Sequence, residues 1–354
     1  MHFAFTDQQL EFRDAVRQVL AKECTPGDVR AAYDAPMARS PRWATLASLG
    51  VVGLAVPDAH GGLGLGLVDL VPLVEEAGRV VLPEPLVETA GLAAPLLADL
   101  EDATTEARVG PWLDALAAGH LTVAVAEPGH PGLPIAGAVG ADLLLLVVDD
   151  GLDGPELHGV DAATVAVTPV PSLDPTRRLG IPAWTPSPET LLASGEQATG
   201  YLSATSDRAA VVVGAELLGL ADAMIVLTSS YAKDRQQFGK PIGSFQAVKH
   251  LLAGAQVLLE FARPAVYGAA WALDVGSEDR SMAPSVAKAY ATEAAVEAAR
   301  VALQVHGAIG YTWECDLHLY LKRTWALSEA WGSAADHRAL VLESLVQDPV
   351  TAGS

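Results

Sequence analysis

The second half of the chain, from about Ser203 onward, carries a long helical pattern of Ala, Leu and Val, and this feature constrains the fold most strongly. Apolar residues that recur at helical spacing over many turns predict packed helices. The pattern is interrupted near Phe238–Gly243 and again near Gly307–Gly310, where turn residues stand. Residues 203–354 are therefore expected to form a C-terminal domain of long helices.

Residues 1–118 also predict a mainly helical domain, and its clearest helix start lies at Thr6. The Thr6 hydroxyl can cap the first turn and the Gln9 side chain can return the bond, which is the capping-box arrangement. A later helical pattern ends at Gly78 and contains Pro72. Because proline disrupts a helix interior, that helix is expected to kink at Pro72 or to begin just before it.

Between these helical parts, residues 119–202 become rich in Val, Gly and Pro and predict a small β domain. Short apolar runs at Leu121–Ala126, Leu143–Val148 and Thr164–Val170, separated by turn residues, are typical of strands. The Pro- and Ser-rich stretch Leu173–Glu196 is expected to be a surface excursion. The sequence thus predicts an α+β fold in the order helix, β, helix.

Charge and composition exclude several functions. The 22 Lys and Arg against 43 Asp and Glu give a net charge of −21, which repels nucleic acid and anionic membranes. An anionic ligand would therefore need its own local Arg, Lys or backbone N–H groups. The strongest apolar run, Leu143–Val148, is far shorter than the ~20 residues that a membrane helix needs, and the nine His and two Cys lack metal-ligand spacing. With no signal-peptide pattern, we expect a cytoplasmic protein without a metal site.

The stretch Tyr231–His250, YAKDRQQFGKPIGSFQAVKH, is the most informative motif. It predicts the end of one long helix, a tight turn, and a second helix capped by Ser244. Arg235 falls at the end of the first helix, where a guanidinium stabilises helix carbonyls and can also fork onto a pyrophosphate. The whole pattern resembles the RxxFGxPI…FQ signature of acyl-CoA dehydrogenases.

Three further blocks resemble the same family. Pro57–Gly64 is similar to its PxxxGGxG block, and Glu75–Arg79 is similar to its EExGR block. Gln304–Tyr311 resembles its QxxGGxGY block, with Ala308 in place of the second Gly. The resemblance covers nearly the full length and implies the family fold: an N-terminal helical domain, a middle β domain and a C-terminal four-helix bundle.

In that family FAD lies between subunits, with the pyrophosphate and adenosine contacted by the neighbouring subunit. The resemblance implies that this chain contacts FAD through six residues, with Arg235 at the pyrophosphate and Gly307 allowing close backbone approach. The other four are Phe238 and Ile242, packed against the adenosine end, and Gln246 and Gln304, hydrogen-bonded to it.

The middle domain departs from the family pattern. Complete members carry a TEPxxGSD-like loop and a WIT-like segment that hold the flavin ring and the thioester. Here the loop Val125–Pro134 reads VAEPGHPGLP and has no Ser-Asp pair, and no WIT-like segment follows before Gly140. The β domain is therefore expected to be shortened, with a defective flavin site of its own.

The positions of the catalytic base also depart from the family pattern. Family members remove a proton from the substrate with a Glu at one of two places, which fall here on Ala209 and on Trp331–Gly332. Neither is acidic. Three nearby acids remain as candidates for the base: Asp207, Glu216 and Glu314.

These departures predict a subunit of a heteromer. The chain resembles the base-lacking subunit of actinobacterial heterotetrameric acyl-CoA dehydrogenases, in which a companion subunit supplies the Glu. The resemblance implies an acyl-CoA substrate and electron-transfer flavoprotein or another electron acceptor as partners. Two alternatives stay open: a self-sufficient homo-oligomeric dehydrogenase with a relocated base, and a non-catalytic scaffold.

Overall fold

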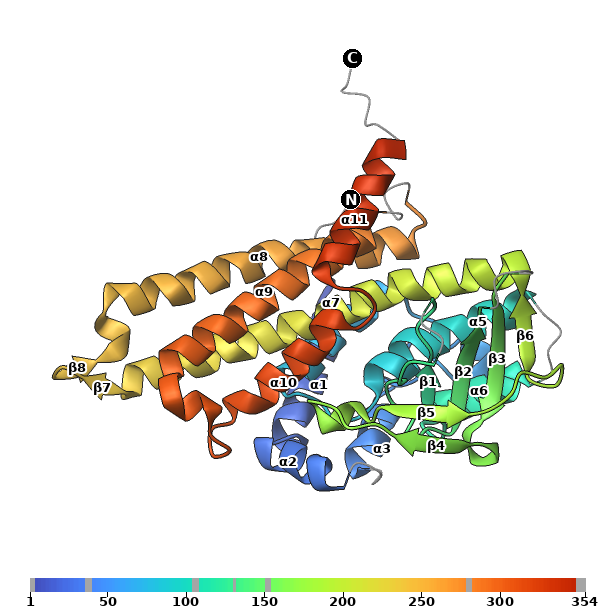
Figure 1. Ribbon diagram of the computed structural model, residues 1–354, viewed down its shortest axis with the longest axis horizontal. Coiled ribbons are helices and arrows are strands. Elements are labelled where there is room, and N and C mark those ends of the chain that lie inside the picture. Colours follow the sequence, from blue (N-terminus) through green and yellow to red (C-terminus); the bar gives the residue numbers. More distant parts are fainter. Residues whose placement is uncertain are drawn as a thin grey trace, which may run out of the picture. The chain divides into compact units, whose positions relative to one another are not determined.

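The structure is a computed structural model that describes residues 4–35, 40–103, 108–129, 132–149, 154–277 and 282–347. The chain folds into two compact units. Unit 1 comprises Met1–Phe12, Gly27–Leu70 and Pro83–Ala209, and unit 2 comprises Arg13–Pro26, Val71–Leu82 and Ala210–Ser354. Figure 1 shows strands in the middle of the chain and long helices in its second half. The predicted order of helix, β and helix is confirmed.

The first helix begins where its capping box predicts. In α1 (Asp7–Glu23) the Gln9 N–H donates to Thr6 Oγ1 over 3.2 Å, and the Thr6 N–H donates to Gln9 Oε1 over 2.8 Å. Helix α4 (Leu67–Arg79) begins well before Pro72 and contains it, so the start predicted just before this proline is wrong. The remaining N-terminal helices are α2 (Pro26–Asp34), α3 (Pro41–Ser48), α5 (Ala94–Ala103) and α6 (Val109–Ala117), with a π-helical turn at Val87–Ala93.

The middle of the chain forms a four-stranded sheet and a separate two-stranded sheet. The larger sheet has the order β1-β2-β3-β6, from Val123–Val125, Leu143–Val148, Glu156–Asp161 and Leu191–Ser194. Strand β1 runs parallel to β2, and the other neighbours are antiparallel. The smaller sheet pairs β4 (Ala166–Pro169) with β5 (Gly180–Ala183).

The stretch Leu173–Glu196 is not a simple surface excursion, and this correction has a physical cause. It contains both β5 and β6, and Asp174 in its first part is fully buried. Strand β6 pairs with β3, and β5 pairs with the preceding β4, so the backbone hydrogen bonds of both strands depend on partners outside the stretch. Pro182 within β5, and Pro186 and Pro188 between the two strands, mask the strand signal.

Unit 2 is built from long helices. It contains most of α7 (Gly195–Asp234), followed by α8 (Gln246–Asp274), α9 (Ala283–His306), α10 (Leu317–Glu329) and α11 (Ala334–Gln347). By length and composition α7 could cross a membrane, but 72% of its most apolar 18-residue window is buried inside the protein. Such burial is typical of a core helix.

Candidate functional site

The end of α7 leads into a small hairpin that Figure 1 shows at one tip of the helical bundle. Strands β7 (Gln236–Gln237) and β8 (Lys240–Pro241) pair there, and the Ile242 N–H donates to the Arg235 carbonyl over 2.8 Å. A 3₁₀ turn follows at Ile242–Ser244, and α8 begins at Gln246. Arg235 is therefore the first residue after α7, held by backbone bonds on both sides of the hairpin.

Ser244 does not cap α8, which corrects the sequence prediction. Its hydroxyl donates to the Pro241 carbonyl over 2.7 Å, and Phe245 occupies the N-cap position without a side-chain bond. The cause is the intervening 3₁₀ turn, whose own carbonyl lies within reach of the serine side chain. The serine thus closes the turn and leaves the helix start displaced by one residue.

Phe238 lies at the tip of the hairpin in an unusual state. Its φ is 54°, in the left-handed region that non-glycine residues seldom adopt, and its side chain is 91% exposed. The ring meets the Phe245 ring edge-on with centroids 6.2 Å apart, and the Lys240 ammonium lies 4.3 Å from the Phe245 centroid. An exposed aromatic ring on a strained backbone position is typical of residues that contact a ligand or partner.

A stacked pair of rings joins this hairpin to the end of α9. Tyr231, in the last turn of α7, and His306, the last residue of α9, have ring centroids 4.3 Å apart and an interplanar angle of 17°. The His306 Nδ1 lies 2.8 Å from the Ala302 carbonyl, so Nδ1 carries the proton of the neutral ring. Burial lowers the pKa of His306, which favours this neutral form at pH 7.

All six predicted cofactor residues therefore lie on two segments of unit 2 that this stack holds together. Gly307 follows His306 with φ 65° and has open space where a side chain would be. The guanidinium of Arg235 makes no ion pair with any residue that the structure describes. Ile242 is half-buried, whereas Arg235, Phe238, Gln246, Gln304 and Gly307 are exposed.

The contact between Tyr231 and His306 was not foreseen from the sequence. Both residues belong to recognisable motifs, but they are separated by all of α8 and nearly all of α9, and no periodicity links them. Stacking of a tyrosine on a histidine has no sequence signal of its own. Only the packing of the helices reveals it.

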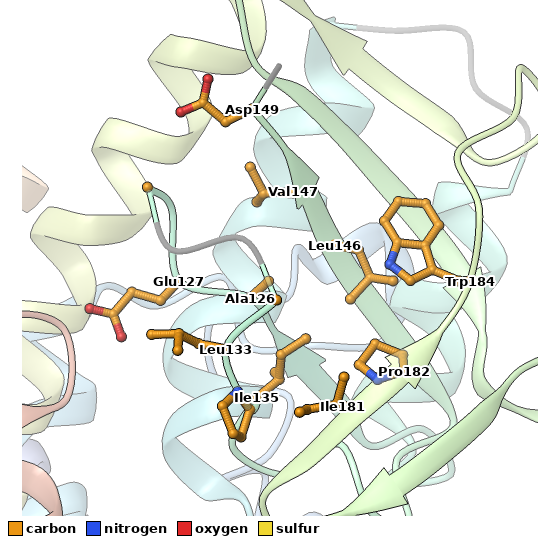
Figure 2. A pocket seen from close by; sticks show the side chains of 13 residues that line it. Ala126, Glu127, Leu133, Ile135, Leu146, Val147, Asp149, Ile181, Pro182 and Trp184 are labelled. Atoms are coloured by element: carbon orange, nitrogen blue, oxygen red, sulfur yellow. The ribbon is translucent and has the colours of Figure 1, made fainter. Parts of the chain in front are cut away.

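A second feature is a hollow of about 120 Å³ in the β region of unit 1. Figure 2 shows Trp184 and Pro182 on one side of it and Glu127 on the other. Among the lining residues that the structure describes, the only charged side chains are those of Glu127 and Asp149, and none carries a hydroxyl, amide or guanidinium donor. His130 and Pro131 of the predicted loop lie outside the described residues. Ligand pockets are usually larger, at about 300–1,000 Å³.

The three candidate acids occupy different environments. Glu216 on α7 is buried and lies 2.5 Å from the Arg323 guanidinium, with both side chains about 5% exposed or less. Asp207, also on α7, is half-buried, and its neighbour Arg208 pairs with Asp99 over 2.7 Å. Glu314 is exposed, beyond the 3₁₀ turn that follows α9. The structure does not gather these three acids into one site.

Chemically, the tip of unit 2 is suited to binding rather than to proton transfer. It presents the Arg235 guanidinium, two glutamine amides and the exposed Phe238 ring, and there is open space beside the Cα of Gly307. Together these groups fit an anionic ligand with an aromatic part. Across the described ranges, no group of three or more His, Cys, Asp or Glu side chains could hold a metal ion.

Two family models match the chain. The model "Acyl-CoA dehydrogenase, N-terminal domain" matches residues 6–120, and the model "Acyl-CoA dehydrogenase, C-terminal domain" matches residues 200–346. Together they include the capping box at Thr6 and every predicted cofactor residue. These matches agree with the element order and with the helical bundle described above.

Similar proteins come from mycobacteria. The acyl-CoA dehydrogenase IpdE2 of Mycolicibacterium smegmatis is 33% identical over 322 residues, covering 90% of this chain and 93% of the relative. FadE34 of Mycobacterium tuberculosis is 37% identical over 304 residues, which cover 80% of this chain but only 39% of FadE34. FadE34 therefore extends far beyond the matched region.

Solved structures share the fold. A structure described as the Tcur3481-Tcur3483 steroid ACAD superposes with a TM-score of 0.83 at 27% identity, covering 98% of this chain and 99% of the other. The ChsE4-ChsE5 complex from Mycobacterium tuberculosis superposes with a TM-score of 0.84 at 23% identity, covering 99% and 100%. The predicted α+β fold with two helical domains and a small β region is thereby confirmed.

Proposed function

The chain belongs to the acyl-CoA dehydrogenase family, and we propose that it serves there as the subunit that completes the FAD site of a companion subunit. Homologues in this family bind FAD, in agreement with the expected cofactor. The observation that carries the proposal is the set of exposed cofactor residues at the tip of unit 2. These residues point to a ligand held by another chain, because they face solvent.

The residues at this tip fit the adenosine diphosphate part of FAD. The Arg235 guanidinium offers two parallel N–H groups to a pyrophosphate, and this local cation offsets the repulsion expected from a net charge of −21. Phe238 and Ile242 supply apolar surface for the adenosine end, and the Gln246 and Gln304 amides supply hydrogen bonds. Gly307 presents backbone without a side chain in the way.

The β region of this chain supports the proposal that a companion subunit, and not this chain, holds the flavin ring. Its hollow is small, and the charged groups among its described lining residues are the carboxylates of Glu127 and Asp149, which repel the negative charge that develops on a reduced flavin or an enolate. None of these described lining residues supplies the hydroxyl donor that a Ser-Asp pair would offer. A companion subunit is therefore proposed to hold the flavin ring and the acyl group.

The companion is also proposed to bring the catalytic Glu. Glu216 is engaged in a buried ion pair, which directs its carboxylate at Arg323. Glu314 lies at the surface, where no apolar pocket shields a proton transfer. Asp207 is the remaining acid and stands two residues before the aligned base position at Ala209, which on a helix turns it about 200° away.

The family relatives add two further supports. One solved structure is described as a complex of two proteins, ChsE4 and ChsE5. FadE34 contains the matched region within a chain more than twice as long, which is the arrangement expected if two dehydrogenase-like halves became one polypeptide. Both fit a chain that works beside a second dehydrogenase unit.

The proposed reaction is the α,β-dehydrogenation of an acyl-CoA thioester, with a bulky acyl group such as a steroid side chain as substrate. FAD, when bound, accepts the hydride that leaves the β-carbon. Electron-transfer flavoprotein or another acceptor would then reoxidise the reduced FAD. The proposed compartment is the cytoplasm. The contribution of this chain is to bind and orient the cofactor.

The proposal is tested by purifying the chain alone and together with its companion. The chain alone is expected to retain little FAD, and co-expression is expected to restore a yellow complex with dehydrogenase activity. The absorbance of the flavin relative to that of the protein gives the FAD content of each preparation. Full FAD occupancy and turnover by the isolated chain would instead establish the self-sufficient enzyme, and a colourless, inactive complex would establish the scaffold.

Substitution of Arg235 tests the site itself. Arg235→Ala is expected to weaken FAD binding in the complex by about 1–3 kcal/mol, because one charged hydrogen-bonding group is lost. Arg300→Ala is the matched control, since it removes an exposed arginine of the same unit that pairs locally with Glu297. Isothermal titration of the FAD-stripped complex measures both. Equal affinities for the two variants would contradict the assignment of Arg235.

A further inference from the structure

We propose that the stacked rings of Tyr231 and His306 are positioning residues that set the separation between the two halves of the FAD-contacting tip. This inference rests on the function proposed above and deepens it. One half of the tip is the hairpin that carries Arg235, and the other is the end of α9 that carries Gln304 and Gly307. The stack is a direct side-chain contact between these halves.

On the α7 side, the backbone transmits the position of Tyr231 to Arg235. The Arg235 N–H donates to the Tyr231 carbonyl over 2.9 Å, and the Ile242 N–H donates to the Arg235 carbonyl over 2.8 Å. The turn that follows packs close as well, because a Cβ on Gly243 would lie 2.9 Å from the Ala232 carbonyl oxygen. A shift of the tyrosine ring therefore moves the arginine and the hairpin together.

On the α9 side, His306 is fixed from two directions. Its Nδ1–H donates to the Ala302 carbonyl over 2.8 Å, which sets the ring orientation. The turn beyond it is equally close, since a Cβ on Gly310 would lie 3.2 Å from the His306 Cβ. Gln304 precedes this ring by two residues and Gly307 follows it directly. The imidazole is thus a rigid end of the segment that presents both of them.

The geometry favours a positioning role over simple filling of space. The two rings are nearly parallel, with their centroids 4.3 Å apart. Such rings can slide past each other, but moving them closer is repulsive and moving them apart loses dispersion energy. His306 is only 6% exposed, so its ring is enclosed by the packed end of α9 and has little room to reorient. Ligand-binding groups must be held within about half an ångström of their working positions.

A neighbouring stack offers a matched control. Trp313 and His318 also stack, with centroids 4.6 Å apart and an angle of 18°, in the same unit. Trp313 lies between α9 and α10, and His318 lies in the first turn of α10, so their contact does not span the two halves of the tip. Loss of this second stack removes a similar ring contact without changing the spacing between Arg235 and Gln304.

The test measures the rate of FAD release from the complex of this chain with its companion, followed by the recovery of flavin fluorescence after dilution. Tyr231→Leu and His306→Leu are each expected to release FAD about tenfold faster, the effect of one lost aromatic pair. Tyr231→Phe and His306→Phe keep a flat ring and are expected to restore slow release. Trp313→Leu is expected to release FAD at the original rate. Circular dichroism confirms that each variant is folded, and His306→Gln replaces His306→Leu if the latter is not.

Release at the original rate from both leucine variants would overturn the inference, as would equally fast release from Trp313→Leu. Release from the phenylalanine variants as fast as from the leucine variants would also overturn it. Arg235→Ala in the same assay distinguishes a failure of the positioning inference from a failure of the proposed function. If Arg235→Ala releases FAD faster while the leucine variants do not, the positioning inference alone is wrong. If Arg235→Ala has no effect, the proposed function is wrong.

Discussion

The His60 imidazole bridges two helices of unit 1 through both of its ring nitrogens. Its Nδ1 lies 2.7 Å from Asp114 Oδ1 on α6, and its Nε2 lies 2.7 Å from Glu101 Oε2 on α5. Only the protonated ring can donate to both carboxylates at once. The hydrogen bond to Asp114, assisted by the bond and charge of Glu101, raises the pKa of His60 above its ordinary value.

This shift predicts a pH-dependent stability. A group whose pKa is raised on folding contributes stability that is complete below its unfolded pKa, about 6.5 for histidine, and that is lost as the pH rises through the folded value. The wild-type melting temperature should therefore fall relative to that of His60→Gln, which cannot ionise, as the pH rises above about 6.5 and through the raised pKa of His60. Thermal unfolding across this range measures the difference. Parallel curves for the two proteins would contradict the bridge.

Glu216 tests whether a candidate base has a structural role. Glu216→Ala leaves Arg323 buried without its carboxylate partner, which is expected to lower the free energy of unfolding by about 3–5 kcal/mol. Glu297→Ala is the control, because its partner Arg300 is exposed and such a pair contributes about 0–1 kcal/mol. Urea unfolding gives both values. Unchanged stability combined with lost turnover of the complex would make Glu216 the base.

At the scale of elements, α4 and α7 cross within unit 2 through a reciprocal pair of glycines. A Cβ on Gly78 would overlap the Glu216 backbone oxygen, and a Cβ on Gly219 would overlap the Glu75 backbone oxygen. The carboxylate of Glu75 on α4 also lies 3.3 Å from Arg263 and accepts a hydrogen bond from the Tyr267 hydroxyl, both on α8. The EExGR motif is thus explained by packing and ion pairing within the helical unit.

The crossing predicts opposite effects for the same substitution at two places on α7. Gly219→Ala forces the helices apart and is expected to cost about 1–3 kcal/mol of stability. Gly200→Ala, where a Cβ meets no atom within 4 Å, is expected to stabilise the protein by about 0.5–1 kcal/mol because alanine favours helix. Chemical denaturation measures both. Equal effects would show that α4 and α7 do not approach closely.

For the whole molecule, the proposal that only the companion subunit holds a flavin ring fixes the FAD content of the assembly. If this chain completes a companion's site and lacks one of its own, the purified complex should hold about half as many FAD molecules as polypeptide chains, whatever closed symmetry it adopts. Native mass spectrometry and flavin absorbance give the ratio. One FAD for every chain would show that the β region of this chain holds flavin after all.

The sequence by itself determined the features that depend on local chemistry. The long helices follow from Ala and Leu at helical spacing, and the capping box at Thr6 follows from two side chains three residues apart. The types and order of the proposed cofactor residues, Arg235 to Gly307, were also readable, because they lie in contiguous motifs.

Only the tertiary structure decided what depends on distant partners. The strands β5 and β6, the displaced start of α8 and the ion pair between Glu216 and Arg323 each require groups that lie far apart in the chain or compete locally for the same bond. The stack of Tyr231 on His306 is of the same kind. Such contacts arise from helix packing, which brings together rings that no spacing in the sequence relates.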